Sequence, residues 1–200
     1  MYKSIRNSQI GIEFTDWHNI IGMAIKHKAQ RVAVFIDVQN MYHSARNLYK
    51  RRVDFSAILE AAVAGRQLIR AFGYVVRTES GEEKQFFEAL ERLGIETREK
   101  DLQIYYGGMK KADWDVGMAI DAVRLSNSVE VIVIVSGDGD FIPLVEYLKN
   151  QGKQTEVIAF GKSASGKLRE MADDFVDLCE NHDQYLLKGI VKSKEEKENK

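Results

Sequence analysis

The sequence predicts an α/β domain in which helices cover both faces of a mainly parallel sheet. Beyond Arg31, apolar runs of strand length alternate with amphipathic runs of helix length, the pattern expected of β-α units. Two apolar runs, 32–36 and 131–135, contain no polar residue, as is typical of strands buried on both faces. A chain of 200 residues with 44% hydrophobic and 30% charged residues is large enough to form one core.

In chain order, we expect strands near 31–37, 67–76, 95–99 with 103–105, 129–136, 154–160 and 175–178. Helices are expected between them, near 41–49, 55–63, 82–93, 115–125, 141–150 and 167–171. Right-handed crossovers between parallel strands place such helices on both faces of the sheet.

Turn and cap residues support these elements. Asp54 and Ser80 stand where the N-caps of the second and third helices are expected. Gly94 and Gly152 stand where helices turn back into strands, and Pro143 falls in the first turn of the 141–150 helix, where its missing N–H costs nothing.

Three regions are expected: an N-terminal accessory helical segment at 1–30, the main domain at 31–180, and a C-terminal helix end with a flexible charged tail at 181–200. The apolar residues between Trp17 and Ile25 fit one face of an amphipathic helix. That helix could pack on its own domain or form a partner interface, for example in a homodimer.

Composition excludes several classes of protein. No run approaches the ~18–20 apolar residues of a membrane span, and the first 25 residues lack the pattern of a secretory signal, so we expect a cytoplasmic protein without membrane contact. The single cysteine, Cys179, cannot form an intramolecular disulfide or supply a zinc cluster by itself. A net charge of -1 neither favours nor excludes RNA, so polyanion binding would require a local cationic patch.

Acidic residues follow two predicted strands at the point where each strand ends. Asp37 ends the first strand, and Asp138 and Asp140 follow the 129–136 strand. Because the carboxyl ends of parallel strands meet at one edge of a sheet, and ligands of open α/β sheets bind there, we expect these carboxylates to lie close together.

A third acidic group opens the 115–125 helix. Asp113 and Asp115 begin it, and Asp121 follows Asp115 by six residues, which places the two side chains 240° apart at 100° per residue, so only one can face the site. Asp115, in the first turn, is the better placed. Structural alternatives exist: Asp37, Asp138 and Asp140 could cap helices, and Asp113 could be solvated or capping.

The physical reason to expect a metal is electrostatic. Carboxylates ~4 Å apart repel each other by about 4 kcal/mol per pair at an effective dielectric of 20, and a divalent cation removes that repulsion. Because these motifs contain no cysteine and no paired histidine, their oxygen ligands favour Mg²⁺ or Mn²⁺ over zinc. Gly137 and Gly139 are expected to bring loop amides close to a phosphate, and Ser136 adds a hydroxyl. Asn40 could close a turn or hold a water on the metal.

Three motifs, 35–40 (FIDVQN), 110–121 (KKADWDVGMAID) and 136–141 (SGDGDF), together resemble the NYN family, most closely its LabA-like branch, within the PIN-like nuclease superfamily. The resemblance covers roughly 31–178 and implies a PIN-like three-layer α/β/α sandwich that hydrolyses phosphodiester bonds, usually in RNA, with Mg²⁺ or Mn²⁺. By position it implies metal ligands at Asp37, Asp115, Asp138 and Asp140, a catalytic set that adds Asn40, and additional site residues at Asp113, Asp121 and Ser136.

The expected function is therefore a metal-dependent ribonuclease acting on single-stranded RNA. Lys110 and Lys111 are the expected phosphate contacts, and Tyr105 and Tyr106 could stack on unpaired bases or be ordinary strand residues. Two alternatives stay open: a non-catalytic RNA-binding or regulatory module, and a metal-dependent phosphatase or nucleotide hydrolase.

Overall fold

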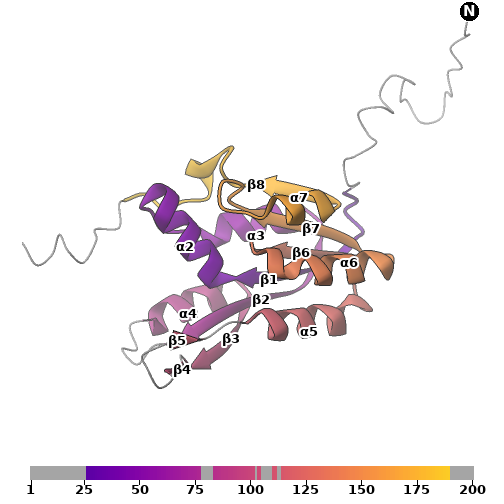
Figure 1. The fold of residues 1–200 in the computed structure, drawn as a ribbon, viewed down its shortest axis with the longest axis horizontal. Coiled ribbons are helices and arrows are strands. Elements are labelled where there is room, and N and C mark those ends of the chain that lie inside the picture. The colour runs from indigo at the N-terminus through magenta and orange to yellow at the C-terminus, as the bar shows by residue number, and fades with distance from the viewer. Residues whose placement is uncertain (1–25, 78–82, 102, 105–109, 112–113, 190–200) are drawn as a thin grey trace, which may run out of the picture.

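The computed structural model describes residues 26–77, 83–101, 103–104, 110–111 and 114–189 (Figure 1). The strands in these residues are β1 (Arg31–Asp37), β2 (Gln67–Arg77), β3 (Ile95–Asp101), β4 (Gln103–Ile104), β5 (Lys110–Lys111), β6 (Val131–Val135), β7 (Gln154–Ala159) and β8 (Asp174–Asp177). The helices are α2 (Val38–Tyr49), α3 (Phe55–Val63), α4 (Lys84–Arg92), α5 (Asp115–Ser126), α6 (Ile142–Asn150) and α7 (Gly166–Met171), with 3₁₀ turns η1 (Gly139–Phe141) and η2 (His182–Gln184).

Six of the described strands form one sheet in the order β3-β2-β1-β6-β7-β8, and every neighbouring pair is parallel. The predicted α/β class with a mainly parallel sheet is confirmed. From β1 the chain adds strands on one side, and from β6 it adds them on the other. The position between β1 and β6 is therefore the topological switch point, where ligands of doubly wound sheets bind.

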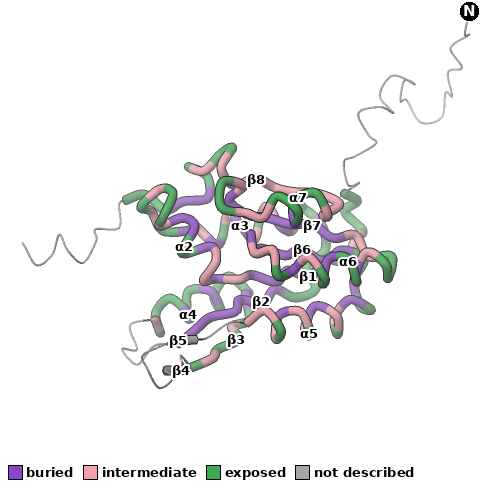
Figure 2. Tube along the Cα trace, viewed as in Figure 1, coloured by how far each residue is buried: buried purple, intermediate pink, exposed green. Residues whose placement is uncertain are grey.

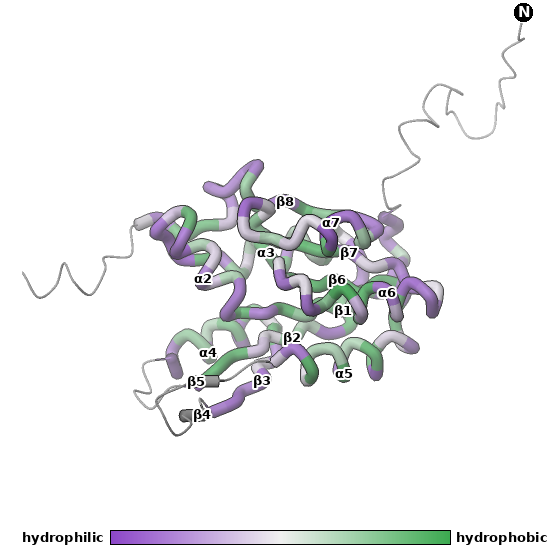
Figure 3. Tube along the Cα trace, viewed as in Figure 1, coloured by the Kyte–Doolittle hydropathy of each residue, from purple (hydrophilic) through white to green (hydrophobic). Residues whose placement is uncertain are grey.

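The sheet separates two apolar cores. Along β1, Val32, Val34 and Ile36 belong to the core beneath α2, α3 and α4, whereas Ala33 and Phe35 belong to the core beneath α5, α6 and α7. Both β1 and β6 are thus buried on both faces, as their unbroken apolar sequences predict. Figures 2 and 3 show these buried, apolar strands through the centre of the molecule.

Most of the predicted local signals are confirmed. The Asp54 carboxylate caps α3 by accepting hydrogen bonds from the amides of Ser56 and Ala57. Gly94 and Gly152 have φ of 81° and 74°, the left-handed conformation that glycine adopts at the ends of helices. Pro143 lies in the first turn of α6. The expected cap Ser80 lies outside the described residues.

The first helix begins earlier than predicted. α2 starts at Val38 rather than near residue 41, because the Asp37 carboxylate accepts a hydrogen bond from the Asn40 amide at 3.0 Å and so caps the helix directly after β1. Strand and helix therefore share Asp37 as their boundary.

The prediction that 103–105 continues the third strand is wrong. β3 runs to Asp101 within the main sheet, whereas β4 pairs antiparallel with β5 in a separate two-stranded ladder. Only five residues separate β4 from β5 in the sequence, a connection short enough for antiparallel pairing.

A buried ion pair joins the end of α3 to β7. The Arg66 guanidinium donates to both Glu156 carboxylate oxygens at 2.6 and 2.8 Å, and each side chain is 1% exposed. Arg66 also donates to the carbonyls of Val63 and Ala62 at the end of α3. Because both charges are paired and hydrogen-bonded, their burial is tolerated.

The packed structure continues beyond β8. Tyr185 and Leu186 are buried in the core, and Leu186 forms an antiparallel bridge with Val53. The accessory segment expected before Arg31 lies outside the described residues except for 26–30, where Lys26 forms an ion pair with Asp174 at 2.8 Å. In the part of the chain that the structure describes, no helix has the length and apolar character needed to cross a bilayer.

Candidate metal centre

The switch point brings three chain segments to one edge of the sheet. β1 ends at Asp37, and its neighbour β6 leads into the loop 136–138 at the same carboxyl edge. α5, which packs against both β1 and β6, begins at Asp115. Acidic residues far apart in the sequence are thereby placed beside one another.

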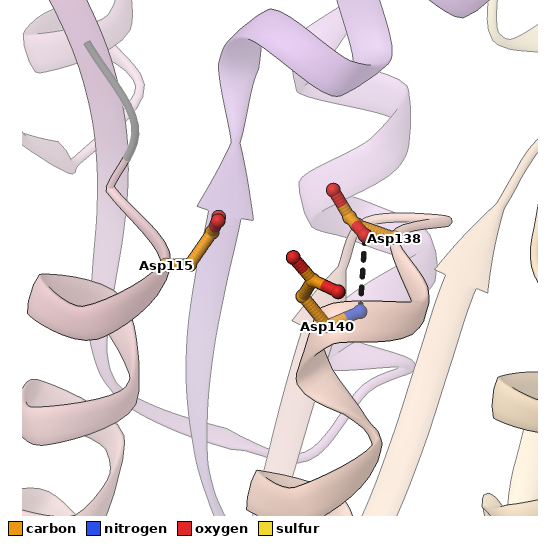
Figure 4. Close-up of side chains that lie close together, drawn as sticks. All are labelled: Asp115, Asp138 and Asp140. Carbon is orange, nitrogen blue, oxygen red and sulfur yellow. Dashed lines mark hydrogen bonds between the residues drawn. The ribbon is translucent and has the colours of Figure 1, made fainter. Parts of the chain in front are cut away.

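The carboxylates of Asp115, Asp138 and Asp140 converge at this edge. Each offers an oxygen within 4.8 Å of an oxygen of the other two. Figure 4 shows Asp115 extending from the first turn of α5 towards Asp138 and Asp140, which belong to the segment after β6. Asp115 and Asp138 are half-buried and Asp140 is exposed. The three side chains thus form a concentrated negative charge that solvent can reach.

The loop after β6 is held by its own hydrogen bonds. The Asp138 carboxylate accepts a hydrogen bond from the Asp140 amide at 3.0 Å and so caps η1. The Asp138 amide donates to the Ser136 hydroxyl at 3.2 Å, and the Gly137 amide donates to the Asn40 side-chain oxygen at 3.1 Å. The expectation that this loop presents amides to a phosphate is therefore wrong for these three amides, which have partners within the protein.

The two glycines of this loop allow a close approach to the segment between β7 and α7. A Cβ atom on Gly137 would lie 3.0 Å from the Cα of Ala164, and one on Gly139 would lie 3.1 Å from the Ser165 hydroxyl. The Ser165 amide also donates to the Gly137 carbonyl at 2.9 Å. Packing against this neighbouring loop, rather than a positive φ, is the reason for glycine here.

Asp37 is not one of the three convergent carboxylates but is connected to them through Ser136. Its second oxygen accepts a hydrogen bond at 3.2 Å from the hydroxyl of Ser136, which is fully buried and also binds the Asp138 amide. Burial raises the pKa of Asp37 above its ordinary value and the negative charge of Asp138 raises it further, while the hydrogen bonds from Asn40 and Ser136 oppose the rise.

Asp121 is held elsewhere on α5. Its carboxylate accepts a hydrogen bond from the Tyr74 hydroxyl at 3.0 Å and lies 3.5 Å from Arg98 and 3.8 Å from Arg124. Burial and the Asp121 carboxylate raise the pKa of the Tyr74 hydroxyl. The structure therefore places Asp115, and not Asp121, with the other acids, as the helical spacing of the two residues predicts.

Trp114, for which the sequence motifs predict no role, is the N-cap of α5 and connects it to β2. Its indole N–H donates to the Val75 carbonyl on β2 at 2.8 Å. Its ring lies against Gly117, where a Cβ atom would come within 2.7 Å of the ring. The sequence signal for this contact is a glycine three residues after a tryptophan at the start of a helix, and the contact ties the start of α5, where Asp115 lies, to β2.

Five further residues considered for the site receive little structural description. Lys110 and Lys111 form β5, paired with Ile104 and Gln103. Asp113, Tyr105 and Tyr106 lie outside the described residues. The roles of Lys110 and Lys111 as phosphate contacts stay predictions.

Comparison with known proteins identifies relatives over most of the chain. The family model described as NYN domain matches residues 31–179. The protein named "Low amplitude and bright protein LabA" from Synechococcus elongatus is 26% identical over 161 residues, which cover 76% of this chain and 85% of that protein. Uncharacterized protein MJ0482 of Methanocaldococcus jannaschii is 28% identical over 160 residues, covering 78% of this chain and 59% of its own length.

A solved structure is also similar. The crystal structure of a protein of unknown function, VPA0982 from Vibrio parahaemolyticus, has a TM-score of 0.73 and 30% sequence identity, covering 82% of this chain and 100% of that one. The four acids Asp37, Asp115, Asp138 and Asp140 all lie within the residues matched by the family model.

Proposed function

Because the chain belongs to the NYN domain family, we propose that it is a metal-dependent nuclease that hydrolyses phosphodiester bonds in single-stranded RNA. The family resemblance predicted from the three sequence motifs is confirmed by the match over 31–179. The observation that carries the proposed activity is the convergence of the Asp115, Asp138 and Asp140 carboxylates at the switch point of the sheet.

The three carboxylates suit a hard divalent cation. Mg²⁺ binds oxygen at about 2.0–2.1 Å, so any two oxygens that bind one ion lie at most about 4.2 Å apart. The oxygens of Asp115, Asp138 and Asp140 lie within 4.8 Å of one another, so side-chain rotations could bring them within that limit. A set of carboxylates alone favours Mg²⁺ or Mn²⁺ over zinc.

In this proposal Asp115, Asp138 and Asp140 hold the ion, and Asp37 adds negative charge behind them. A bound divalent ion activates water and stabilises the entering and leaving oxygens of an in-line displacement. The protein's own contribution is to hold the ligands in place. Ser136 links Asp37 to the Asp138 amide, and Asn40 holds the amide of Gly137, so the loop that carries two ligands is tied to the start of α2.

The experiment is cleavage of labelled single-stranded RNA and matched DNA by purified protein with Mg²⁺, Mn²⁺ or EDTA. Asp138→Asn keeps an acceptor for the Asp140 amide but removes a charge from the metal centre. Changes to the hydrogen-bond partners of metal ligands typically lower activity roughly 10–100-fold. Because Asp138→Asn changes a ligand itself, we expect a larger loss of cleavage rate. Asp121→Asn is the matched control, because Asp121 lies on the same helix as Asp115 but outside the cluster.

Each outcome has a distinct meaning. Metal-dependent cleavage that is lost in Asp138→Asn and kept in Asp121→Asn supports the proposal. Full activity of Asp138→Asn would contradict the assignment of the site. RNA binding without cleavage would indicate a regulatory binding module instead, and neither binding nor cleavage would favour a small phosphoester as substrate.

A further inference from the structure

A groove with a volume of about 730 Å³ begins at the candidate metal centre and continues between α5 and α6. Asp115 and Asp140 line its acidic end, and Ile120 and Tyr147 line it further along the two helices. The two helices both begin at the carboxyl edge of the sheet, so the groove leads away from the carboxylates along the surface of the molecule.

The walls of this groove are apolar yet exposed. Val116, Ile120 and Tyr147 are 69%, 46% and 46% exposed. Val116 and Ile120 are four residues apart on α5, and Pro143 and Tyr147 are four residues apart on α6, so each helix presents one apolar stripe to the groove. Exposed apolar side chains that line a groove beside a few charged groups are typical of ligand sites.

We propose that this groove binds an unpaired nucleobase of the strand whose phosphate is cleaved, an inference that rests on the proposed nuclease function. The flat faces of a base are apolar and pack on aromatic and aliphatic side chains such as Tyr147 and Ile120. A base inside a duplex is stacked and paired and cannot enter without leaving the helix. The groove therefore selects single strands.

The dimensions fit this occupant. Ile120 lies five residues after Asp115, which is about 7.5 Å along α5 at 1.5 Å per residue and is comparable to the span from a phosphate, across its ribose, to its base. The volume is within the roughly 300–1,000 Å³ typical of ligand sites. At the far end, the Arg124 side chain is 77% exposed and its contact with Asp121 is 3.8 Å long, so its charge can contact the next phosphate.

The acidic end of the groove favours nucleic acid over a protein segment. An apolar helix laid along the groove would bring no divalent ion to the end that Asp115 and Asp140 line. A strand whose phosphate meets a divalent ion at these carboxylates satisfies both the charged and the apolar parts of the groove.

The test uses full-length protein, one labelled single-stranded RNA and a series of strands that each lack one base near the scissile bond. We expect the wild-type protein to cleave one abasic strand about tenfold more slowly than the intact strand, in the range of a single base contact. Ile120→Ser should slow cleavage of the intact strand by a similar factor. This variant should cleave that abasic strand no more slowly than the intact strand, and Tyr147→Ala should behave in the same way. Ile69→Ser is the control, because Ile69 is 42% exposed and lies near the opposite end of β2 from the carboxyl edge.

Failure of this inference and failure of the nuclease proposal give different results. If the wild-type protein cleaves intact and abasic strands equally, or if Ile120→Ser keeps the abasic loss, the groove assignment is wrong and the nuclease stands. If the wild-type protein cleaves no strand, the nuclease proposal is wrong, and RNA binding in EDTA then tests the groove. Weaker RNA binding by Ile120→Ser than by Ile69→Ser would support a base site. Equal RNA binding by the two variants would overturn it. A change in solution mass with unchanged cleavage in Ile120→Ser would identify a second copy as the occupant and overturn the proposal.

Discussion

Asp37 combines a structural role with an electrostatic cost. Its carboxylate caps α2, but burial and the nearby charge of Asp138 raise its pKa, so the ionised form is destabilised in the folded protein. Well below its ordinary pKa of 3.8, Asp37 is protonated in both the folded and the unfolded state and costs no stability. As the pH rises from 3.8 through the higher pKa of the folded state, the Asp37 carboxyl loses its proton more readily in the unfolded chain than in the folded protein. The free energy of unfolding therefore falls over this pH range.

We expect Asp37→Asn to raise the melting temperature of the metal-free protein near neutral pH and to weaken the fall in stability above about pH 4. Asparagine caps helices as well as aspartate does, so the hydrogen bond from the Asn40 amide is kept, and its side-chain amide can donate to the Ser136 hydroxyl in place of accepting from it. Thermal unfolding in EDTA, measured for both proteins across this pH range, checks the expectation. A lower melting temperature for the variant at neutral pH would contradict it.

Gly137 is a residue at which one added methyl group should reach the metal centre. In Gly137→Ala the Cβ would meet the Ala164 backbone at 3.0 Å, so the loop carrying Asp138 and Asp140 must move. We expect a loss of about 1–3 kcal/mol in unfolding free energy, as for other overpacked sites, together with at least roughly tenfold slower cleavage. Denaturant unfolding and rate measurements check this.

The control for that substitution is Gly166→Ala. Gly166 opens α7 and has no positive φ, and a Cβ atom added there would meet no atom within 4 Å. Stability and activity close to wild type are expected, and a loss equal to that of Gly137→Ala would show that close packing is not the cause.

At the scale of elements, the Arg66–Glu156 pair ties α3 to β7. We expect Arg66→Met to lower the free energy of unfolding by about 3–5 kcal/mol, because it leaves the buried Glu156 carboxylate without its bidentate partner. Lys26, 3.7 Å from Glu156, should keep the loss towards the lower value. Arg31→Met breaks a pair whose two side chains are each 47% exposed and should cost much less, because water screens the two charges. Urea unfolding of both variants compares the two, and equal losses would contradict the reasoning.

The sequence predicts the elements better than their ends. Apolar runs such as 131–135 identify a buried strand without knowledge of its neighbours, because burial on both faces requires an unbroken apolar surface. The start of α2 depended on whether Asp37 would accept the Asn40 amide, a hydrogen bond that competes with other uses of the same carboxylate. The pairing of β4 with β5 depends on the path of the chain, which the periodicity of two-residue segments cannot show.

For the whole molecule, the concentrated acids predict that cations stabilise the fold. An ion that binds only the native state at 100 times its dissociation constant adds about 2.7 kcal/mol, and each 1 kcal/mol shifts the melting temperature of a protein of this size by about 2–4 °C. We expect Mn²⁺ or Mg²⁺ to raise the melting temperature by about 5–10 °C over EDTA at saturation. Asp138→Asn should remove most of the shift and Asp121→Asn should keep it; an equal shift in both variants would place the ion elsewhere.

The parallel topology explains why much of the site could be predicted. Strands that share a direction bring their carboxyl ends together, so Asp37, Asp138 and Asp140 could be assigned to one edge from sequence alone, and helical spacing separated Asp115 from Asp121. The indole contact of Trp114 with β2 and the groove beside Ile120 could not be predicted, because they depend on which side chains remain exposed after packing.

The loop after β6 packs against the segment before α7. The last quarter of the chain is therefore necessary for the metal centre, although none of the acidic residues of the site lies in it. A chain cut after Asn150 would still contain Asp37, Asp115, Asp138 and Asp140, yet it would lack Ala164 and the Ser165 amide that support Gly137. Retaining every acidic residue is therefore not enough when the protein is shortened or when its motifs are transferred to another scaffold. The smallest working unit is set by what holds the acids, and it extends beyond the last of them.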